Sequence, residues 1–145
     1  MLTGRFGNTS GAPYLEARIS IPRLRLHGLI SFLVDTGADG TVLMPTDSKK
    51  IGVNFRSLRN PTTSQGVGGL AKGYTEEVIL SFRDPKYIYS YLLNVEIAAP
   101  TTRNNRIPSL LGRDILDQWR FVLDAPRNKI LLTPRIWDLR QKIRR

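Results

Sequence analysis

An apolar run that ends in a carboxylate is the feature that most constrains this chain. Residues 29–34 are apolar apart from Ser31, which is typical of a buried β-strand, and Asp35 follows directly. A carboxylate placed there is costly unless it is hydrogen-bonded or has a function. The next two residues fit such a site, because the Thr36 hydroxyl can hold neighbouring backbone and Gly37 lets the backbone approach the carboxylate closely. The segment therefore predicts a functional turn built around Asp35.

Most of the remaining chain consists of short alternating segments separated by Gly, Pro and Asn. These segments predict strands at residues 14–21, 78–82 and 87–97, and a hairpin in which residues 121–123 and 130–132 flank a polar turn. Strands of this length and spacing, with few helical segments between them, indicate an all-β class.

Only two segments have apolar residues at helical spacing. The first follows Gly112 and the second lies in the tail, residues 134–145. Their apolar residues are Ile115, Leu116 and Trp119 in the first, and Ile136, Leu139 and Ile143 in the second. We expect one short helix after Gly112. The tail could form a terminal helix, but its apolar face is narrow, which favours a packed or frayed end.

Composition removes several classes of catalytic chemistry. A length of 145 residues suits one domain and leaves little room for two. With no cysteine, the chain has no disulfide, thiolate metal site or thiol nucleophile. The only histidine, His27, lies beside Arg23 and Arg25, which disfavours both a Ser-His-Asp triad and a His-rich metal site. If the chain is an enzyme, we therefore expect its acid–base chemistry to use carboxylates, of which it has twelve.

The formal net charge of +10 raises the question of nucleic-acid binding. Residues 133–145 hold five basic residues against Asp138, and the other basic residues are scattered without an aromatic-interleaved stripe. A solvated basic surface is therefore favoured over a nucleic-acid partner. We expect a cytoplasmic protein without a transmembrane segment, because the sequence has neither a long apolar run nor a signal-peptide pattern.

Two ligand-binding motifs can be tested and rejected. An EF-hand loop beginning at Asp35 would have Gly37 at its third position and Thr46 at its twelfth, so two calcium ligands are missing. Residues 66–71 match the dinucleotide pattern GxGxxA, but residues 60–65 do not suggest the required strand and no helix pattern follows. The sequence therefore predicts neither a metal nor a cofactor.

Three motifs in sequence order resemble one known family. They are Asp-Thr-Gly-Ala-Asp at residues 35–39, the glycine loop at residues 66–69, and Leu-Leu-Gly-Arg-Asp at residues 110–114. Together they resemble the retropepsins, the retroviral-type aspartic proteases, over about residues 14–120. The resemblance implies a single-lobed closed β-barrel of the acid protease fold. It suggests a protease domain at residues 14–133, followed by a basic tail at residues 134–145. The glycines at positions 4, 7 and 11 suggest that residues 1–13 are a flexible arm or a site of self-cleavage.

The resemblance also implies roles for individual residues. The catalytic aspartate would be Asp35, with Thr36 making a hydrogen bond across two subunits and Gly37 and Asp39 contacting substrate backbone. Arg113 would support the site by pairing with Asp39. A flap at about residues 63–75 would carry Gly66, Val67 and Gly68 at its tip, with Val67 touching substrate. The apolar subsites would be lined by Val42, Pro108 and Leu110.

Counting carboxylates sets the expected stoichiometry. Hydrolysis of a peptide bond by an activated water needs one group to accept a proton and another to donate one, and two facing carboxylates that share a proton can do both. No aspartate other than Asp35 is followed by Ser or Thr and then Gly. An active site would therefore require a symmetric homodimer, with one Asp35 from each copy. The resemblance implies an aspartic endopeptidase that acts on peptide substrates, with the hairpin at residues 121–132 supplying the dimer interface. The alternative is a non-catalytic module that keeps the fold and binds peptide or nucleic acid.

Overall fold

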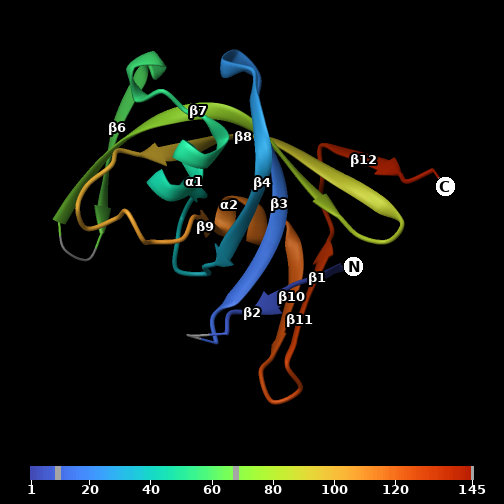
Figure 1. Cartoon of the computed structure of the whole chain (residues 1–145). Helices are drawn as coiled ribbons and strands as arrows, with labels where there is room; N and C mark the ends of the chain where they lie inside the picture. The colour runs from blue at the N-terminus through green and yellow to red at the C-terminus, as the bar shows by residue number, and fades with distance from the viewer. Residues whose placement is uncertain (9–10, 67–68, 145) are drawn as a thin grey trace.

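The computed structural model describes residues 1–8, 11–66 and 69–144 of a mostly β protein. Six strands form a closed barrel in the order β8-β5-β9-β4-β3-β7, and the barrel closes because β7 also pairs with β8 (Figure 1). The barrel strands are β3 (Pro13–Ile21), β4 (Leu26–Val34), β5 (Val42–Leu43), β7 (Gly69–Arg83), β8 (Tyr87–Ala98) and β9 (Leu110–Leu111). The predicted all-β class and closed barrel are confirmed.

The remaining elements extend the barrel or lie beside it. Strand β6 (Asn60–Gly66) pairs with β7, β2 (Arg5–Phe6) with β3, and β12 (Leu139–Lys142) with β8. A second sheet has the order β1-β11-β10, and its far end extends away from the barrel in Figure 1. Its strands are β1 (Leu2–Thr3), β10 (Trp119–Asp124) and β11 (Lys129–Pro134). The helices are α1 (Pro45–Ile51) and α2 (Arg113–Leu116), with 3-10 turns η1 (Pro22–Leu24) and η2 (Phe55–Ser57).

The alternating pattern of the sequence explains the barrel. In β3 every second residue from Leu15 to Ile21 is buried, and the residues between them are exposed or half-buried. In β4 the same alternation buries Ile30, Phe32 and Val34. The apolar face of each strand therefore points into one core, which is how a period of two builds a barrel wall.

An aromatic cluster joins the barrel to the second sheet. The rings of Phe82 and Trp119 meet edge to face at 4.7 Å between centroids, and the Trp119 Nε1 donates to the Tyr91 hydroxyl at 2.7 Å. That hydroxyl donates in turn to the carbonyl of Ile136 at 2.7 Å. Burial raises the pKa of Tyr91 to about 12. The cluster fixes where β10 begins and holds the chain that leads into the tail.

The tail is a strand and not a helix, so the terminal-helix alternative was wrong. Strand β12 pairs antiparallel with residues 87–90 of β8, and the Leu92 amide donates to the Asp138 carboxylate at 2.7 Å. The Arg140 guanidinium lies over the rings of Tyr87 and Trp137. A helix this short is marginal in water, whereas the edge of β8 offers unpaired backbone groups. The edge of β8 therefore determined the conformation of the tail.

The described part of the N-terminal segment is ordered, contrary to the flexible arm expected over residues 1–13. Leu2 is fully buried, β1 pairs with β11, and the Gly4 amide donates to the Ile130 carbonyl at 3.0 Å. The amino group of Met1 lies 2.8 Å from the buried Asp84 carboxylate. Burial of one leucine and pairing along a free strand edge outweigh the glycine content that suggested flexibility.

Two further elements differ from expectation. Residues 60–65 form most of β6, although their polar composition suggested no strand; β7 pairs with them along their whole length. Helix α1 was not predicted, although Pro45 stands at its start and Gly52 ends it at φ 97°. The GxGxxA pattern at residues 66–71 leads into strand β7. The helix that a dinucleotide-binding motif requires is therefore missing after it. Among the described residues, no helix is long and apolar enough to cross a membrane.

Candidate active site

The candidate site is the loop that leaves the carboxyl end of β4 and leads into β5. Strand β9 lies parallel to β4, with Leu33 opposite Leu110 and Val34 opposite Leu111. The Asp35 amide extends this ladder by donating to the Leu111 carbonyl at 3.0 Å. The residue at which β4 ends is therefore fixed by pairing with a segment that comes much later in the chain.

The turn after β4 holds the Asp35 carboxylate by a backbone donor. The Gly37 amide donates to Asp35 Oδ1 at 2.9 Å, and the Ala38 amide donates to the Asp35 carbonyl at 3.2 Å. Asp35 is half-buried, whereas Thr36 and Gly37 are exposed. A Cβ at Gly37 would stand 3.2 Å from the carboxylate oxygen, so glycine allows this close approach. The loop presents an ordered carboxylate at the surface.

Arg113 of α2 braces the loop from the opposite side. Its side chain donates to the Thr36 carbonyl at 3.2 Å and forms an ion pair with Asp39, as expected from the sequence. Its amide also donates to the Ala38 carbonyl at 2.9 Å. The Asp39 side chain is 93% exposed, so it remains accessible to a ligand. Whether Gly37 and Asp39 contact substrate stays a prediction.

A second brace uses Asp114, to which the sequence assigned no role. Its carboxylate accepts from the Thr41 amide at 2.9 Å and from the Thr41 hydroxyl at 2.7 Å. The same hydroxyl accepts from the Gly112 amide at 3.2 Å. Gly112 packs so closely on Gly40 that an added Cβ would be 2.4 Å from the Gly40 carbonyl carbon. The sequence offered one sign of this role, because Asp114 directly follows Arg113 in the Leu-Leu-Gly-Arg-Asp motif.

The residues expected to line subsites are only partly brought together. Val42 and Leu110 are register partners and both are half-buried, so their side chains are neighbours on the barrel wall. Pro108, two positions before Leu110, lines a cavity of about 350 Å³ together with Thr46, Asp47 and other residues. Its contact with substrate, like that of Val42 and Leu110, stays a prediction.

The expected flap corresponds to the hairpin of β6 and β7. The register runs from Asn60 opposite Thr75 to Gly66 opposite Gly69, and Gly69 has φ 111°, a conformation that favours glycine. The expected tip residues Val67 and Gly68 lie outside the described residues. The hairpin is present, and its movement over a substrate stays a prediction.

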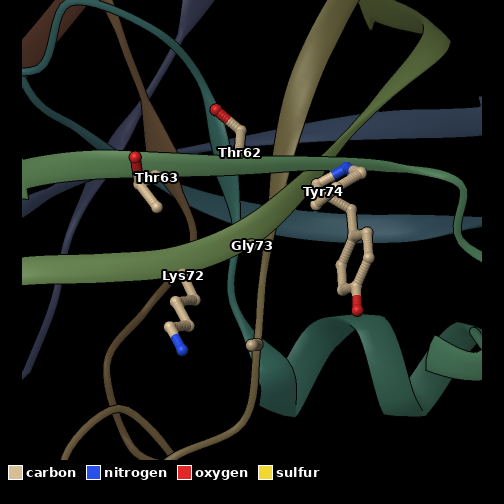
Figure 2. A pocket seen from close by; sticks show the side chains of 7 residues that line it. Thr62, Thr63, Lys72, Gly73 and Tyr74 are labelled. Carbon is tan, nitrogen blue, oxygen red and sulfur yellow. The ribbon is translucent and has the colours of Figure 1, made fainter.

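A cavity of about 650 Å³ lies at the base of this hairpin. It is lined by Pro61, Thr62, Thr63, Lys72, Gly73, Tyr74 and Ala99. Figure 2 shows the side chains of Lys72 and Tyr74 extending from the same side of β7. The Ala99 amide donates to the Lys72 carbonyl at 3.0 Å, which ties the hairpin base to the end of β8.

The described residues contain no group of three or more His, Asp or Glu side chains that could hold a metal ion. His27 lies exposed near the start of β4, whereas Asp35 follows the end of that strand. The one imidazole is therefore at the opposite end of β4 from the candidate carboxylate.

The chain matches the model of one protein family. A family model described as retroviral aspartyl protease matches residues 9–124, most of the chain. The chain belongs to the retroviral aspartyl protease family. The matched range includes the Asp35 loop, the β6–β7 hairpin and the Arg113 segment, the three features that carried the resemblance.

Solved structures of proteases share the fold. A retropepsin-like aspartic protease from Rickettsia conorii is 18% identical, with a TM-score of 0.63 over 99% of this chain and 92% of its own. The EIAV protease, in complex with the inhibitor HBY-793, is 22% identical, with a TM-score of 0.52 over 77% of this chain and 90% of its own. No curated protein matches the sequence.

Proposed function

We propose that this retropepsin-like protein is an aspartic endopeptidase in which Asp35 is the catalytic residue. The observation that carries the proposal is the Asp35 carboxylate itself, held by the Gly37 amide at 2.9 Å on a loop braced by Arg113. A carboxylate fixed by the backbone and left accessible to water is the group that acid–base hydrolysis requires.

The reaction needs two such carboxylates. In aspartic protease dyads two facing carboxyl groups share one proton, because they cannot both ionise at close range. The ionised Asp35 takes a proton from the attacking water while the protonated one donates to the carbonyl oxygen of the scissile bond. Since the sequence has a single Asp-Thr-Gly, the second Asp35 comes from a second copy of the chain. The active form is thus a homodimer with both loops at its two-fold axis.

The hairpin of β10 and β11 is the proposed dimer interface. Strand β10 is an edge strand of its sheet, and it carries Val122 and Leu123, which are 37% and 49% exposed. The hairpin begins at Trp119, three positions after the last residue of α2, the helix that carries Arg113. Pairing of two such edges would satisfy their unpaired backbone groups and place these side chains beside those of the second copy. The exposed Thr36 hydroxyl is then free to bond across the two loops.

Substrate would bind as an extended peptide between the Asp35 loops and the β6–β7 hairpin. The hairpin acts as the flap over about residues 63–75, with Gly66, Val67 and Gly68 at the tip closing over the peptide backbone. Alternate substrate side chains point into apolar subsites that include Val42, Pro108 and Leu110. No cofactor takes part in this chemistry.

The proposal is tested by digestion of a mixed peptide library with the wild-type protein and Asp35→Asn. The substitution keeps the size and the Gly37 hydrogen bond but removes the acid–base group, so cleavage should fall by at least about a thousandfold while the folded fraction is retained. Equal cleavage by both proteins would contradict the proposal. Peptide binding without any cleavage by the wild type would favour the non-catalytic module instead.

A further inference from the structure

A carboxylate stands among the apolar residues expected to line the substrate site. Val42 pairs with Leu110 on one side and with Glu96 of β8 on the other. Register partners on adjacent strands point to the same face of a sheet. The side chains of Val42, Leu110 and Glu96 are therefore neighbours in one row across the barrel wall.

This row lies on the face that carries the candidate catalytic residue. The next residues along the same strands, Leu43, Ile97 and Leu111, are fully buried in the core, so the row is on the opposite face. Leu33 of β4 pairs with Leu110 and belongs to the same row, and Asp35 follows two positions later. Alternation along the strand places Asp35 on that side as well.

The Glu96 side chain reaches from the barrel wall to the candidate flap. It crosses the β7 backbone at Gly73, where an added Cβ would be 3.0 Å from Glu96 Oε1 and 3.2 Å from its Cγ. Beyond Gly73 the carboxylate accepts a hydrogen bond from the Ser64 hydroxyl of β6 at 3.2 Å. Glu96 is half-buried, so part of the side chain still faces solvent.

Glu96 forms no ion pair within the part of the chain that the structure describes. The buried Glu76 on the next strand, by contrast, is paired with Arg23. The chain as a whole carries a net charge of +10. An acidic side chain without a cationic partner, next to a substrate face of a strongly basic protein, is available to a positive charge on a ligand.

We propose that Glu96 is a specificity-determining residue that selects a substrate with a Lys or Arg side chain at the subsite lined by Val42 and Leu110. This inference rests on the proposed protease function and names the class of its substrate. The aliphatic stem of a lysine or arginine packs on the two apolar side chains while its charged end reaches the carboxylate. Ser64 is a positioning residue, because its hydroxyl holds the carboxylate over Gly73.

The test uses peptide pairs that differ only in Lys or norleucine, which has the same stem without the charge. The residue is moved stepwise along the peptide on both sides of the cleaved bond, and kcat/KM is measured with the wild-type protein, Glu96→Gln and the control Glu77→Gln. Glu77 is an exposed residue of β7 opposite Asn94, two positions from Glu96 along β8, so its substitution removes an equal charge from the same face but outside the row. At one position the wild type and the control should prefer Lys by about five- to tenfold, and Glu96→Gln should lose that preference.

The experiment distinguishes failure of the specificity proposal from failure of the proposed protease function. An equal Lys-to-norleucine ratio in wild type and Glu96→Gln overturns the specificity proposal even when both proteins cleave. If neither peptide is cleaved, the proposed protease function is wrong. The Lys preference is then tested by binding, from the dissociation constants of the two peptides for the same three proteins. Absence of a Lys preference in those constants also overturns the specificity proposal. If Glu96→Gln does not fold, the wild type still decides, because a charge-based preference must weaken as salt is raised to about 0.5 M.

Discussion

The Thr41 hydroxyl donates a 2.7 Å hydrogen bond to the Asp114 carboxylate, joining two segments 73 residues apart. Thr41 is 2% exposed, and its hydroxyl also accepts from the Gly112 amide. This one side chain therefore ties the end of the Asp35 loop to the start of α2. The catalytic geometry proposed above depends on that connection as much as on Asp35.

Thr41→Val should destabilise the protein by about 1–3 kcal/mol. The substitution keeps the shape of the side chain but leaves the Gly112 amide and one Asp114 oxygen without their partner. Urea unfolding measures the change. Thr102→Val, at an exposed loop position, is the control and should change stability by less than about 0.5 kcal/mol. Equal effects of the two substitutions would contradict the bracing role.

Gly112→Ala should be more harmful than Gly40→Ala, although the two glycines touch. An added Cβ at Gly112 would be 2.4 Å from the Gly40 backbone, whereas one at Gly40 meets only the Asp114 carboxylate, at 3.7 Å. Backbone displacement of this kind costs about 1–3 kcal/mol or more. Thermal unfolding of both variants tests the difference, and similar melting temperatures would count against the observed contact.

Arg113→Lys should lower activity more than stability. Arg113 and Asp39 are 42% and 93% exposed, so their ion pair contributes at most about 1 kcal/mol. A lysine cannot bridge the Thr36 carbonyl and Asp39 together, so the loop loses its orientation. We expect kcat/KM to fall by about tenfold or more with little change in unfolding free energy. Arg56→Lys, on exposed η2, is the control, and an equal loss of kcat/KM there would contradict this account.

Asp84 should contribute to the loss of stability in acid. Burial is the largest influence on its pKa and raises it. Hydrogen bonds from the Met1 amino group and the amides of Lys86 and Tyr87 outweigh burial and leave the pKa below its ordinary value of 3.8. A lowered folded-state pKa gives stability that is complete above the unfolded value and is lost as pH falls through the folded value.

The measurement is unfolding free energy against pH for wild type, Asp84→Asn and the exposed control Asp117→Asn. Wild type and control should lose stability steeply below about pH 4, and Asp84→Asn should begin less stable and lose less over the same range. Parallel curves for all three proteins would show that Asp84 is not the group responsible.

The sequence predicted those elements whose own pattern decides their structure. Strands β3 and β8 were placed within a residue or two, because their alternation continues along the whole strand. For the tail, the spacing of Ile136, Leu139 and Ile143 left a helix open beside the favoured packed or frayed end. Pairing of residues 139–142 with the edge of β8 decided for a packed strand. Strand β6 was missed for the same reason, since its pairing with β7 overrides its polar composition.

In the candidate site, too, some residues could be identified from local sequence and others only from long-range contacts. Asp35 and its turn could be found from local sequence, because the apolar strand, the carboxylate and the glycine are adjacent. The contact of Asp114 with Thr41 joins a helix to a distant loop, and the place of Glu96 beside Val42 depends on the register between distant strands. No local pattern contains that register, so these residues could be assigned only from the structure.

The central claim, that each active site takes one Asp35 from each of two chains, is tested most directly by mixing wild-type protein with Asp35→Asn. Total protein is held constant, subunits are exchanged by unfolding and refolding together, and activity is measured against the wild-type fraction. The account predicts a dependence on the square of that fraction, so an equal mixture retains about a quarter of full activity. A linear dependence, with about half of the activity retained, would show that one chain carries a complete active site and would contradict the account.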